Sequence, residues 1–404
     1  MRILAIETSC DETAISILEA EGDATNASFM VRGNALYSQA TKHASFGGVY
    51  PSLAKREHAA NLVPLLNQTL RESRLARDTT TTVDTATMHT LTVLLAREHD
   101  LLRTLHTYTC SIERPAIDAL AVTQGPGLEP ALWVGVNFAR ALSLLWNVPI
   151  YAVNHLEGHL VASAVNQDAV HASRYRMTES IRFPALGLIL SGGHTEFIYA
   201  TAWGAYQIVG QTRDDSIGEA FDKVARLLGI PYPGGPGLSR LADKGRPALH
   251  TRQVPVGPRT QPLPRPMLRS GDLDFSFSGL KTAVLYQTRE LGELQDETKN
   301  RIAADFEDAV TEVILQKTTD ALDRYPAHTF ILGGGVSANI YIRSRLANLF
   351  AKKQEVTLRL PASGLSTDNA VMIGMAGYLM HVRGARTYQG TDDLRASSTL
   401  SVAS

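Results

Sequence analysis

The feature that most constrains this chain is a strand–turn–strand pattern that occurs once in each half. Residues 3–6 and 14–18 are short apolar runs on either side of a polar turn, and such a pair of runs predicts a β-hairpin. Residues 185–190 and 197–200 flank a second turn, rich in glycine, in the same way. The two halves share a pattern and not a sequence identity. The pattern suggests that one structural unit has been duplicated.

Helical and further strand patterns follow each hairpin. Apolar spacing predicts helices over residues 56–70, 132–146 and 218–228, and strands over residues 118–123 and 329–332. Strands that alternate with helices in two similar halves predict an α/β protein with a cleft between two lobes. A length of 404 residues suits two lobes of comparable size.

The expected lobes are residues 1–150 and 151–404, and two stretches interrupt them. Residues 78–111 begin with a threonine-rich segment and separate two elements of the first lobe. Residues 247–269 are rich in proline and arginine and predict a surface loop. Its arginines offer either a solvated loop, which is the favoured interpretation, or phosphate contacts for RNA; they are Arg252, Arg259, Arg265 and Arg269.

Composition limits where such a protein works. The longest apolar runs are too short to span a bilayer, and the apolar run at residues 3–6 leaves no room for a leader peptide. Cys10 and Cys110 cannot make a disulfide framework. We therefore expect a cytoplasmic protein. The net charge of −1 does not indicate a nucleic-acid binder, so phosphate neutralisation would need a local basic strip or a partner subunit.

His155 and His159 are the first residues that indicate chemistry. They lie four residues apart behind Asn154, a good helix N-cap, so both imidazoles would share one helix face. Two imidazoles so placed can bind one transition metal. Glu157 lies two residues from each histidine and points elsewhere, unlike the glutamate of zinc peptidases. An isolated His-x-x-x-His pair is more often two helix histidines hydrogen-bonded to neighbouring groups than a metal site. A third ligand is therefore needed to favour the metal interpretation.

Asp368 is the candidate for that third ligand. It precedes an apolar helix predicted over residues 370–380, where an acidic residue is also an ordinary cap. Two histidines and a carboxylate would suit Fe(II) or Zn(II) and leave coordination positions open for a substrate.

Three glycine-rich turns are candidates for anion or nucleotide contacts. They are residues 191–195, 232–237 and 333–339. Glycines let backbone amides approach an anion, but none of the turns matches a P-loop or a dinucleotide fingerprint, and each could be only a tight turn. Asp222, on the predicted helix 218–228, could accept hydrogen bonds from a ribose or be a surface acid.

Read in order, these motifs resemble one family closely. The motifs that carry the resemblance are residues 6–13, 47–51, 124–127, 155–159, 191–195, 218–223, 275–282, 333–339 and 367–369. The family is the tRNA N6-adenosine threonylcarbamoyltransferases, TsaD in bacteria, formerly described as glycoproteases. The resemblance covers nearly the whole chain except about residues 78–111, and residues 45–49 look bacterial.

The resemblance implies a fold, a metal site and a donor site. The fold would be that of the actin, Hsp70 and sugar kinase superfamily, with a nucleotide cleft between duplicated lobes. A C-terminal helix over residues 368–382 would pack back on the first lobe. His155, His159 and Asp368 match the family's metal ligands for one divalent ion, with Fe2+ favoured and Zn2+ possible, so the metal would bridge the lobes. The positions that match the binding site of threonylcarbamoyl-adenylate are Ile189, Leu190, Ser191, Gly192, Gly193, Asp222, Gly235 and Asn339.

The resemblance also implies a reaction and its partners. The threonylcarbamoyl group would pass from the adenylate to N6 of adenosine 37 in tRNAs that read codons beginning with A, and AMP would be released. Family members work with a paralogous partner subunit and a small accessory ATPase. The inserted residues 78–111 have no counterpart in the usual pattern, which leaves the mode of pairing open.

Three rival functions remain at this point. A metallopeptidase would need a glutamate beside the metal-bound water, and Glu157 points the wrong way. An ATPase or sugar kinase on the same fold would not need the His-x-x-x-His pair. A non-catalytic scaffold related to the partner subunit would lack the three metal ligands, which this chain keeps.

Overall fold

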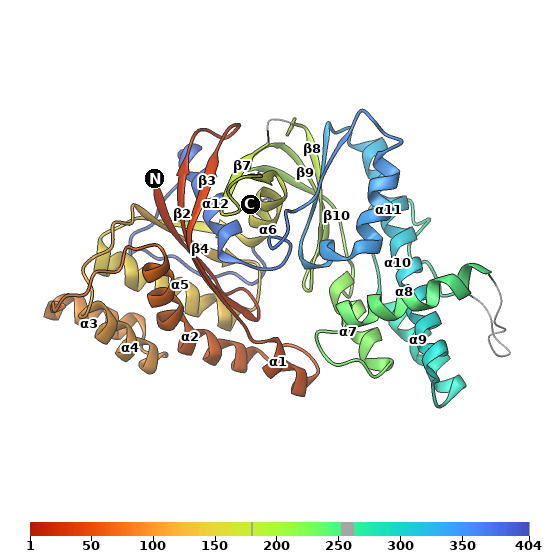
Figure 1. The fold of residues 1–404 in the computed structure, drawn as a ribbon, viewed down its shortest axis with the longest axis horizontal. Helices are drawn as coiled ribbons and strands as arrows, with labels where there is room; N and C mark the ends of the chain where they lie inside the picture. Colours follow the sequence, from red (N-terminus) through yellow and green to blue (C-terminus); the bar gives the residue numbers. More distant parts are fainter. Residues whose placement is uncertain (179–180, 252–261, 404) are drawn as a thin grey trace. The chain divides into compact units, whose positions relative to one another are not determined.

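The chain forms two compact units, seen in a computed structural model that describes residues 1–178, 181–251 and 262–403 (Figure 1). Unit 1 comprises Met1–Ala40, Val49–Glu179 and Pro361–Ser404. Unit 2 comprises Thr41–Gly48 and Ser180–Leu360. None of the helices in the described ranges combines the length and apolar character needed to cross a membrane.

Unit 1 is built on a mixed sheet. Among the described residues its strand order is β5-β4-β1-β2-β3-β7-β6. β1 pairs antiparallel with β2 and parallel with β4, and β4 pairs parallel with β5. The strands are β1 (Arg2–Glu7), β2 (Glu12–Glu21), β3 (Ser28–Ser38), β4 (Ala119–Gly125), β5 (Ile150–Asn154), β6 (Val165–Gln167) and β7 (Arg174–Met177).

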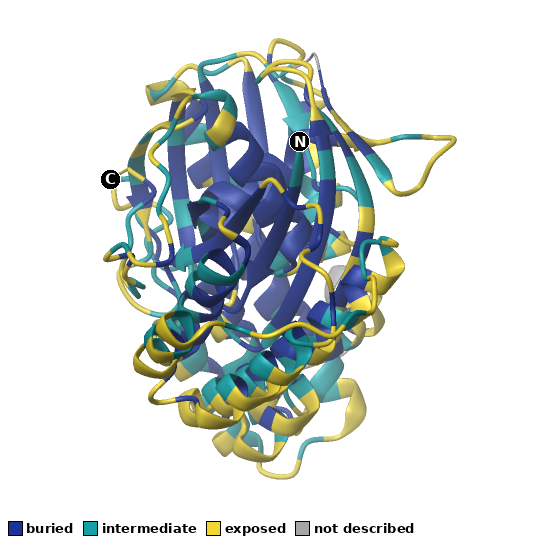
Figure 2. Cartoon of the chain, turned by 90° about the vertical axis from the view of Figure 1, so that its left-hand side faces the viewer, coloured by how far each residue is buried: buried dark blue, intermediate teal, exposed yellow. Residues whose placement is uncertain are grey.

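Helices cover both faces of this sheet, which explains why its central strands are apolar throughout. Leu4 and Ile6 of β1 join a core cluster with the long helices α2 and α5. Ala5 points the other way, where a Cβ on Gly374 of α12 would lie 3.2 Å from the Ala5 Cβ. The helices of this unit are α2 (Pro51–Glu72), α3 (Thr85–Leu94), α4 (His99–Thr109), α5 (Glu129–Trp146), α6 (His155–Ser163) and α12 (Ala370–Val382). Figure 2 shows that buried residues line these packed strands and helices.

Unit 2 contains a second mixed sheet. Within the described part its strand order is β10-β9-β8-β11-β12, with β8 parallel to β11 and antiparallel to β9. The strands are β8 (Ala185–Leu190), β9 (Thr195–Ala202), β10 (Ala205–Gln211), β11 (Thr329–Gly333) and β12 (Thr357–Arg359). The helices are α7 (Ile217–Leu227), α8 (Gly235–Thr251), α9 (Ser278–Leu291), α10 (Asp296–Arg324), η2 (Gly335–Ala338) and α11 (Ile340–Phe350). A short segment with α1 (Ala40–His43) and η1 (Ala44–Phe46) precedes α2.

The two sheets repeat one topology. β3-β2-β1-β4-β5 in unit 1 corresponds strand for strand to β10-β9-β8-β11-β12 in unit 2. In each sheet three consecutive strands form an antiparallel meander. The first strand of that meander also pairs in parallel with a later strand. The predicted α/β class, both predicted hairpins and the duplication are confirmed.

The units divide the chain differently from the expected boundary at residue 150. β5 pairs with β4, so β5 and the following α6 are part of unit 1. The helix expected over residues 368–382 is α12, which packs on β1 and β2 of the same unit. The boundary between the units depends on which parallel strands pair with one another. The residues next to each strand in the sequence do not reveal that pairing.

The expected surface loop over residues 247–269 is partly helical. α8 continues through Pro247 to Thr251, whereas Arg252 and Arg259 lie outside the described residues. Arg265 is paired with Glu312 at 2.8 Å and Asp305 at 3.3 Å, so these carboxylates neutralise its charge.

Residues 78–111 are a helical hairpin that packs into unit 1. A backbone hydrogen bond from the Thr79 N–H to the Ser111 carbonyl and an antiparallel bridge between Asp78 and Ile112 close its base. Its apolar face joins the core cluster of α2 and α5 through Leu91, Leu95, Leu101 and Leu105. The segment is therefore part of the core and not a surface addition.

Candidate active site

The histidine pair is positioned by the junction of β5 and α6. Asn154 ends the strand and caps the helix, because its Oδ1 accepts hydrogen bonds from the backbone N–H groups of Leu156 (2.9 Å) and Glu157 (3.4 Å). His155 and His159 then lie one turn apart, with ring centroids separated by 4.8 Å. The predicted cap and the predicted common face are both present.

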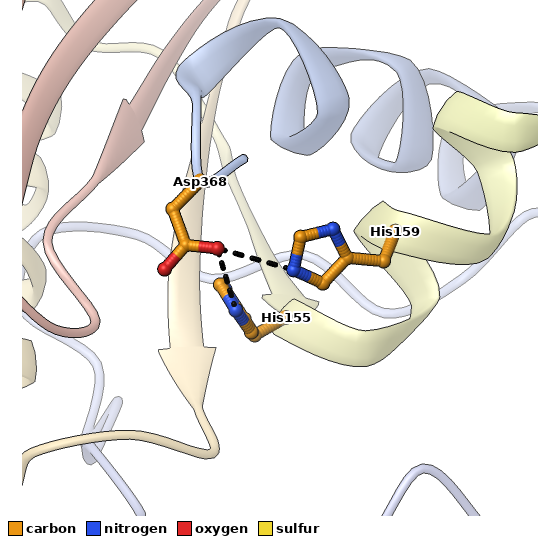
Figure 3. Close-up of side chains that lie close together, drawn as sticks. All are labelled: His155, His159 and Asp368. Atoms are coloured by element: carbon orange, nitrogen blue, oxygen red, sulfur yellow. Dashed lines mark ion pairs between the residues drawn. The ribbon is translucent and has the colours of Figure 1, made fainter. Parts of the chain in front are cut away.

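Asp368 reaches the same point from the segment before α12. The cap of that helix is Asn369, whose Oδ1 accepts from the N–H of Met372 at 2.9 Å, so the capping alternative for Asp368 is wrong. Asp368 Oδ1 lies 3.1 Å from His159 Nε2 and 3.4 Å from His155 Nε2 (Figure 3). One atom from each residue falls within 4.8 Å of the others. All three residues belong to unit 1, so the expectation that they come from two lobes is not met.

The two histidines are buried, Asp368 is partly exposed, and His159 has few hydrogen-bond partners. His155 and His159 are 5% and 1% exposed. Within the described ranges, neither ring nitrogen of His159 makes a hydrogen bond of good geometry, although Nε2 is close to Asp368. A buried polar atom left without a partner is costly. Two imidazoles and a carboxylate are ligands that Fe2+ and Zn2+ accept, so the donor set fits a metal.

Electrostatics hold the cluster together when no metal is bound. Burial lowers the pKa of His155, but Asp368 and Glu7 outweigh it and raise that pKa well above its ordinary value. Burial raises the pKa of Asp368, and His155 and His159 reverse this and lower it. Burial lowers the pKa of His159, which favours the neutral ring that a metal requires.

Glu157 is directed away from this cluster. Its Oε1 accepts a hydrogen bond from Arg383 at 2.6 Å. A peptidase needs a carboxylate beside the metal-bound water, and this one is held in an ion pair instead. The geometry therefore does not support the peptidase alternative.

The glycine turns predicted after residues 185–190 and 329–332 meet in unit 2. β8 and β11 are parallel neighbours, so both turns lie at the carboxyl edge of the sheet, where α/β proteins bind ligands. Gly334 has φ +86°, and a Cβ there would lie 2.5 Å from the Leu190 carbonyl oxygen. A Cβ on Gly192 or Gly193 would meet no described atom within 4 Å. The backbone at Gly192 and Gly193 is thus accessible to a ligand.

The remaining predicted donor-site residues join this edge through a chain of contacts. The backbone N–H of Gly218, in α7, donates to the Ser191 carbonyl at 3.1 Å. Asp222 Oδ1, on the same helix, accepts from the N–H groups of Gly234 (2.7 Å) and Gly235 (3.3 Å). Asp222 therefore holds the turn that leads into α8.

Asn339 closes the chain of contacts. Its Oδ1 caps α11 at Ile342 (2.9 Å), and its Nδ2 donates to Ser239 of α8 at 2.9 Å and to Glu307 of α10 at 2.7 Å. Ile189 and Leu190 have fully buried side chains, so only their backbone can face a ligand. The structure brings all eight predicted donor-site positions into one region of unit 2.

Sequence reasoning missed three acidic or polar residues around these sites. Glu7 contacts His155, and Ser239 and Glu307 hold the Asn339 amide. Glu7 lies at the end of a buried strand and within the family motif of residues 6–13. That position in the sequence is the signal that could have identified Glu7. Nothing near Ser239 or Glu307 in the sequence indicates their partner, because Asn339 is distant in the chain.

The fold and sites define an α/β protein with a duplicated sheet unit, a His–His–Asp cluster with both histidines buried, and a pair of glycine turns at one sheet edge. The sequence model for TsaD, tRNA N6-adenosine threonylcarbamoyltransferase, matches residues 30–87 and 107–375. The unmatched residues 88–106 lie inside the insertion expected at about 78–111. The chain belongs to this family and is an acyltransferase that modifies tRNA.

Named relatives agree with this assignment. The tRNA N6-adenosine threonylcarbamoyltransferase of Bacillus subtilis (strain 168) is 36% identical over 404 residues, covering 98% of this chain and 96% of that protein. The enzyme of the same name from Methylobacillus flagellatus is 39% identical over 378 residues, 93% of this chain and 92% of that protein. Among solved structures, a ROK hexokinase from Thermus thermophilus is 12% identical, with a TM-score of 0.40 over 94% of this chain and all of the hexokinase.

Proposed function

We propose that this enzyme transfers the threonylcarbamoyl group from threonylcarbamoyl-adenylate to N6 of adenosine 37 in tRNAs reading codons that begin with A. AMP is released, and one divalent metal ion, Fe2+ in preference to Zn2+, is held by His155, His159 and Asp368. The observation that carries the proposal is the convergence of the two buried histidines and the partly exposed Asp368 within 4.8 Å in a chain of this family.

The metal and the protein have separate tasks in this proposal. When bound, the metal supplies Lewis-acid polarisation and open coordination positions. The His159 ring, without hydrogen-bond partners of good geometry in the described part of the chain, is prepared to be a ligand. Asp368, with its lowered pKa, remains a carboxylate and offsets the metal's charge.

The adenylate is assigned to the glycine-turn site of unit 2. The backbone N–H groups of Gly192 and Gly193 would stabilise the phosphate as negative charge develops on it. Asp222, Gly235 and Asn339 lie along the chain of contacts that frames the turn. N6 of the adenine bonds to the threonylcarbamoyl carbonyl carbon, the bond from that carbon to the phosphate oxygen breaks, and N6 loses a proton. Since AMP is a good leaving group, positioning supplies much of the rate.

The proposed partners are those that the family resemblance implies, and the charge of the chain is consistent with a need for one of them. Its net charge of −1 is a poor match for tRNA phosphates, and Arg265 in the candidate basic patch is already paired. We propose that a paralogous partner subunit contributes to tRNA binding and that a small ATPase supports turnover, in the cytoplasm.

The test is a transfer assay with a His155→Ala variant. Preformed threonylcarbamoyl-adenylate, unmodified tRNA and the accessory subunits are combined with each protein, and nucleosides are quantified by mass spectrometry. We expect the wild type to form threonylcarbamoyladenosine and the variant to lose metal and activity while remaining folded. A variant that kept full metal content and activity would refute the ligand assignment. No product from the wild type, with adenylate binding confirmed, would refute the reaction.

A further inference from the structure

We propose that Glu7 is a positioning residue for His155, fixing which nitrogen of the imidazole ring carries the proton. The inference rests on the proposed metal site, because its consequence is that His155 presents an unprotonated Nε2 to the ion. Glu7 contacts the proposed metal ligand His155, so its role is to orient that ligand.

The contact between the two side chains defines the tautomer. Glu7 ends β1 and is fully buried, and its Oε2 lies 3.2 Å from His155 Nδ1. An ionised carboxylate only accepts hydrogen bonds, so Nδ1 must carry the proton. In the neutral ring that a metal requires, the lone pair is then on Nε2, the nitrogen that faces Asp368 at 3.4 Å. A ligand histidine held in this way is oriented and made more basic.

Other donors fix Glu7 itself. Its Oε1 accepts from the backbone N–H of Ser9 at 2.5 Å, and its Oε2 accepts from Thr123 Oγ1 at 2.5 Å. Thr123 is on β4, the parallel neighbour of β1, so the sheet register brings it to the carboxylate. Three donor groups share the two carboxylate oxygens of Glu7, and none of these three contacts requires Glu7 to donate a hydrogen bond.

Because the contacts of Glu7 all require it to accept hydrogen bonds, the substitution Glu7→Gln tests its role directly. A glutamine has one accepting oxygen and one donating NH2 group. The Ser9 N–H is fixed in the backbone and needs the oxygen, so the NH2 group is left facing Thr123 and His155. The threonine hydroxyl can rotate to accept. His155 can accept on Nδ1 only by moving its proton to Nε2, which blocks the metal-binding nitrogen.

The experiment measures Zn2+ affinity by competition with a chromophoric chelator for wild type, Glu7→Gln, Glu157→Gln and His155→Ala. Glu157→Gln is the matched control, since it makes the same chemical change on α6 itself but Glu157 contacts Arg383. We expect Glu7→Gln to weaken Zn2+ binding by about 10- to 100-fold and Glu157→Gln to leave it within about 2-fold of wild type. Thermal unfolding of the metal-free proteins shows that each variant is folded.

A second measurement needs no variant. In Zn2+-loaded wild type with 15N-labelled histidine, NMR should show the His155 proton on Nδ1. A proton on Nε2, with the metal on Nδ1, overturns the inference even if Glu7→Gln fails to fold. The inference is also overturned if a folded Glu7→Gln variant binds Zn2+ with wild-type affinity while His155→Ala loses the metal. If His155→Ala keeps the metal, the proposed metal site itself is wrong.

Discussion

At the scale of single residues, partners decide the role of each acidic side chain in this protein. Asp368 and Asn369 are adjacent, yet Asn369 caps α12 and Asp368 contacts the two histidines. Glu157 lies on the same helix as those histidines and is bound to Arg383. Glu196 on β9 differs from these, because no described group makes a hydrogen bond to its Oε2.

Glu196 gives a residue-scale prediction about pH. Burial raises its pKa from 4.5 to about 7, so the folded state binds this proton more tightly than the unfolded state. Its stabilising contribution is complete below pH 4.5 and is lost as the pH rises through 7, amounting to at most about 3 kcal/mol by pH 8. Glu196→Gln should therefore be more stable than wild type at pH 8 and similar at pH 5, measured by urea unfolding. Equal pH dependence in both proteins would contradict the prediction.

At the scale of elements, helices α3 and α4 show that a segment largely unmatched by the family's sequence model can still be structural. Leu101 and Leu105 of α4 are buried in the cluster that contains α2 and α5. Glu98, at the start of α4, pairs with Lys55 of α2 at 2.9 Å. The hairpin therefore covers an apolar surface of α2 and α5 that would otherwise be exposed.

Leu105→Ala tests this packing. Deleting a fully buried leucine side chain should lower the free energy of unfolding by about 2–5 kcal/mol. Thr107→Ala on the exposed face of the same helix is the control, with an expected change within about 0.5 kcal/mol. Urea denaturation followed by circular dichroism compares the two. If Leu105→Ala were as mild as the control, the insertion would not be part of the unit 1 core.

At the scale of the whole molecule, one sheet topology occurs twice and the two copies carry different chemistry. The His–His–Asp cluster belongs to unit 1, and the glycine turns belong to unit 2. The strand ends of the two sheets bear different residues: Glu7 ends β1, whereas Leu190 and the open Ser191–Gly193 turn follow at the corresponding end of β8. One sheet topology thus carries two kinds of candidate site, because the residues at the corresponding strand ends differ.

Metal removal should therefore act on one unit. Trp133 and Trp146 are in unit 1 and Trp203 is in unit 2, so a Trp203→Phe variant reports unit 1 by fluorescence and a Trp133→Phe/Trp146→Phe variant reports unit 2. Zn2+ at about 100-fold over its Kd should stabilise unit 1 by about 2.7 kcal/mol relative to protein in chelator. The unit 2 transition should not move. If the two reporters show separate transitions, equal shifts of both would contradict a metal site contained in unit 1.

The sequence by itself determined the local elements and much of the site chemistry. Hydrophobic periodicity predicted both hairpins and the helices that became α2, α5, α7 and α12, because spacing along the chain decides which residues share a face. Ordered motifs identified the family and named His155, His159 and Asp368, which the structure brings together. Local capping chemistry also predicted the role of Asn154.

Only the tertiary structure decided which of these elements share a unit and which side chains meet. β5 and α12 belong to unit 1 because they pair with or pack on its sheet, and such long-range contacts leave no local pattern. Pairing of β1 with β4 brings Thr123 to Glu7, and the β5–α6 junction brings His155 to the same carboxylate. Periodicity records only a residue's neighbours along the chain, whereas hydrogen-bond partners are set by how distant strands register against one another.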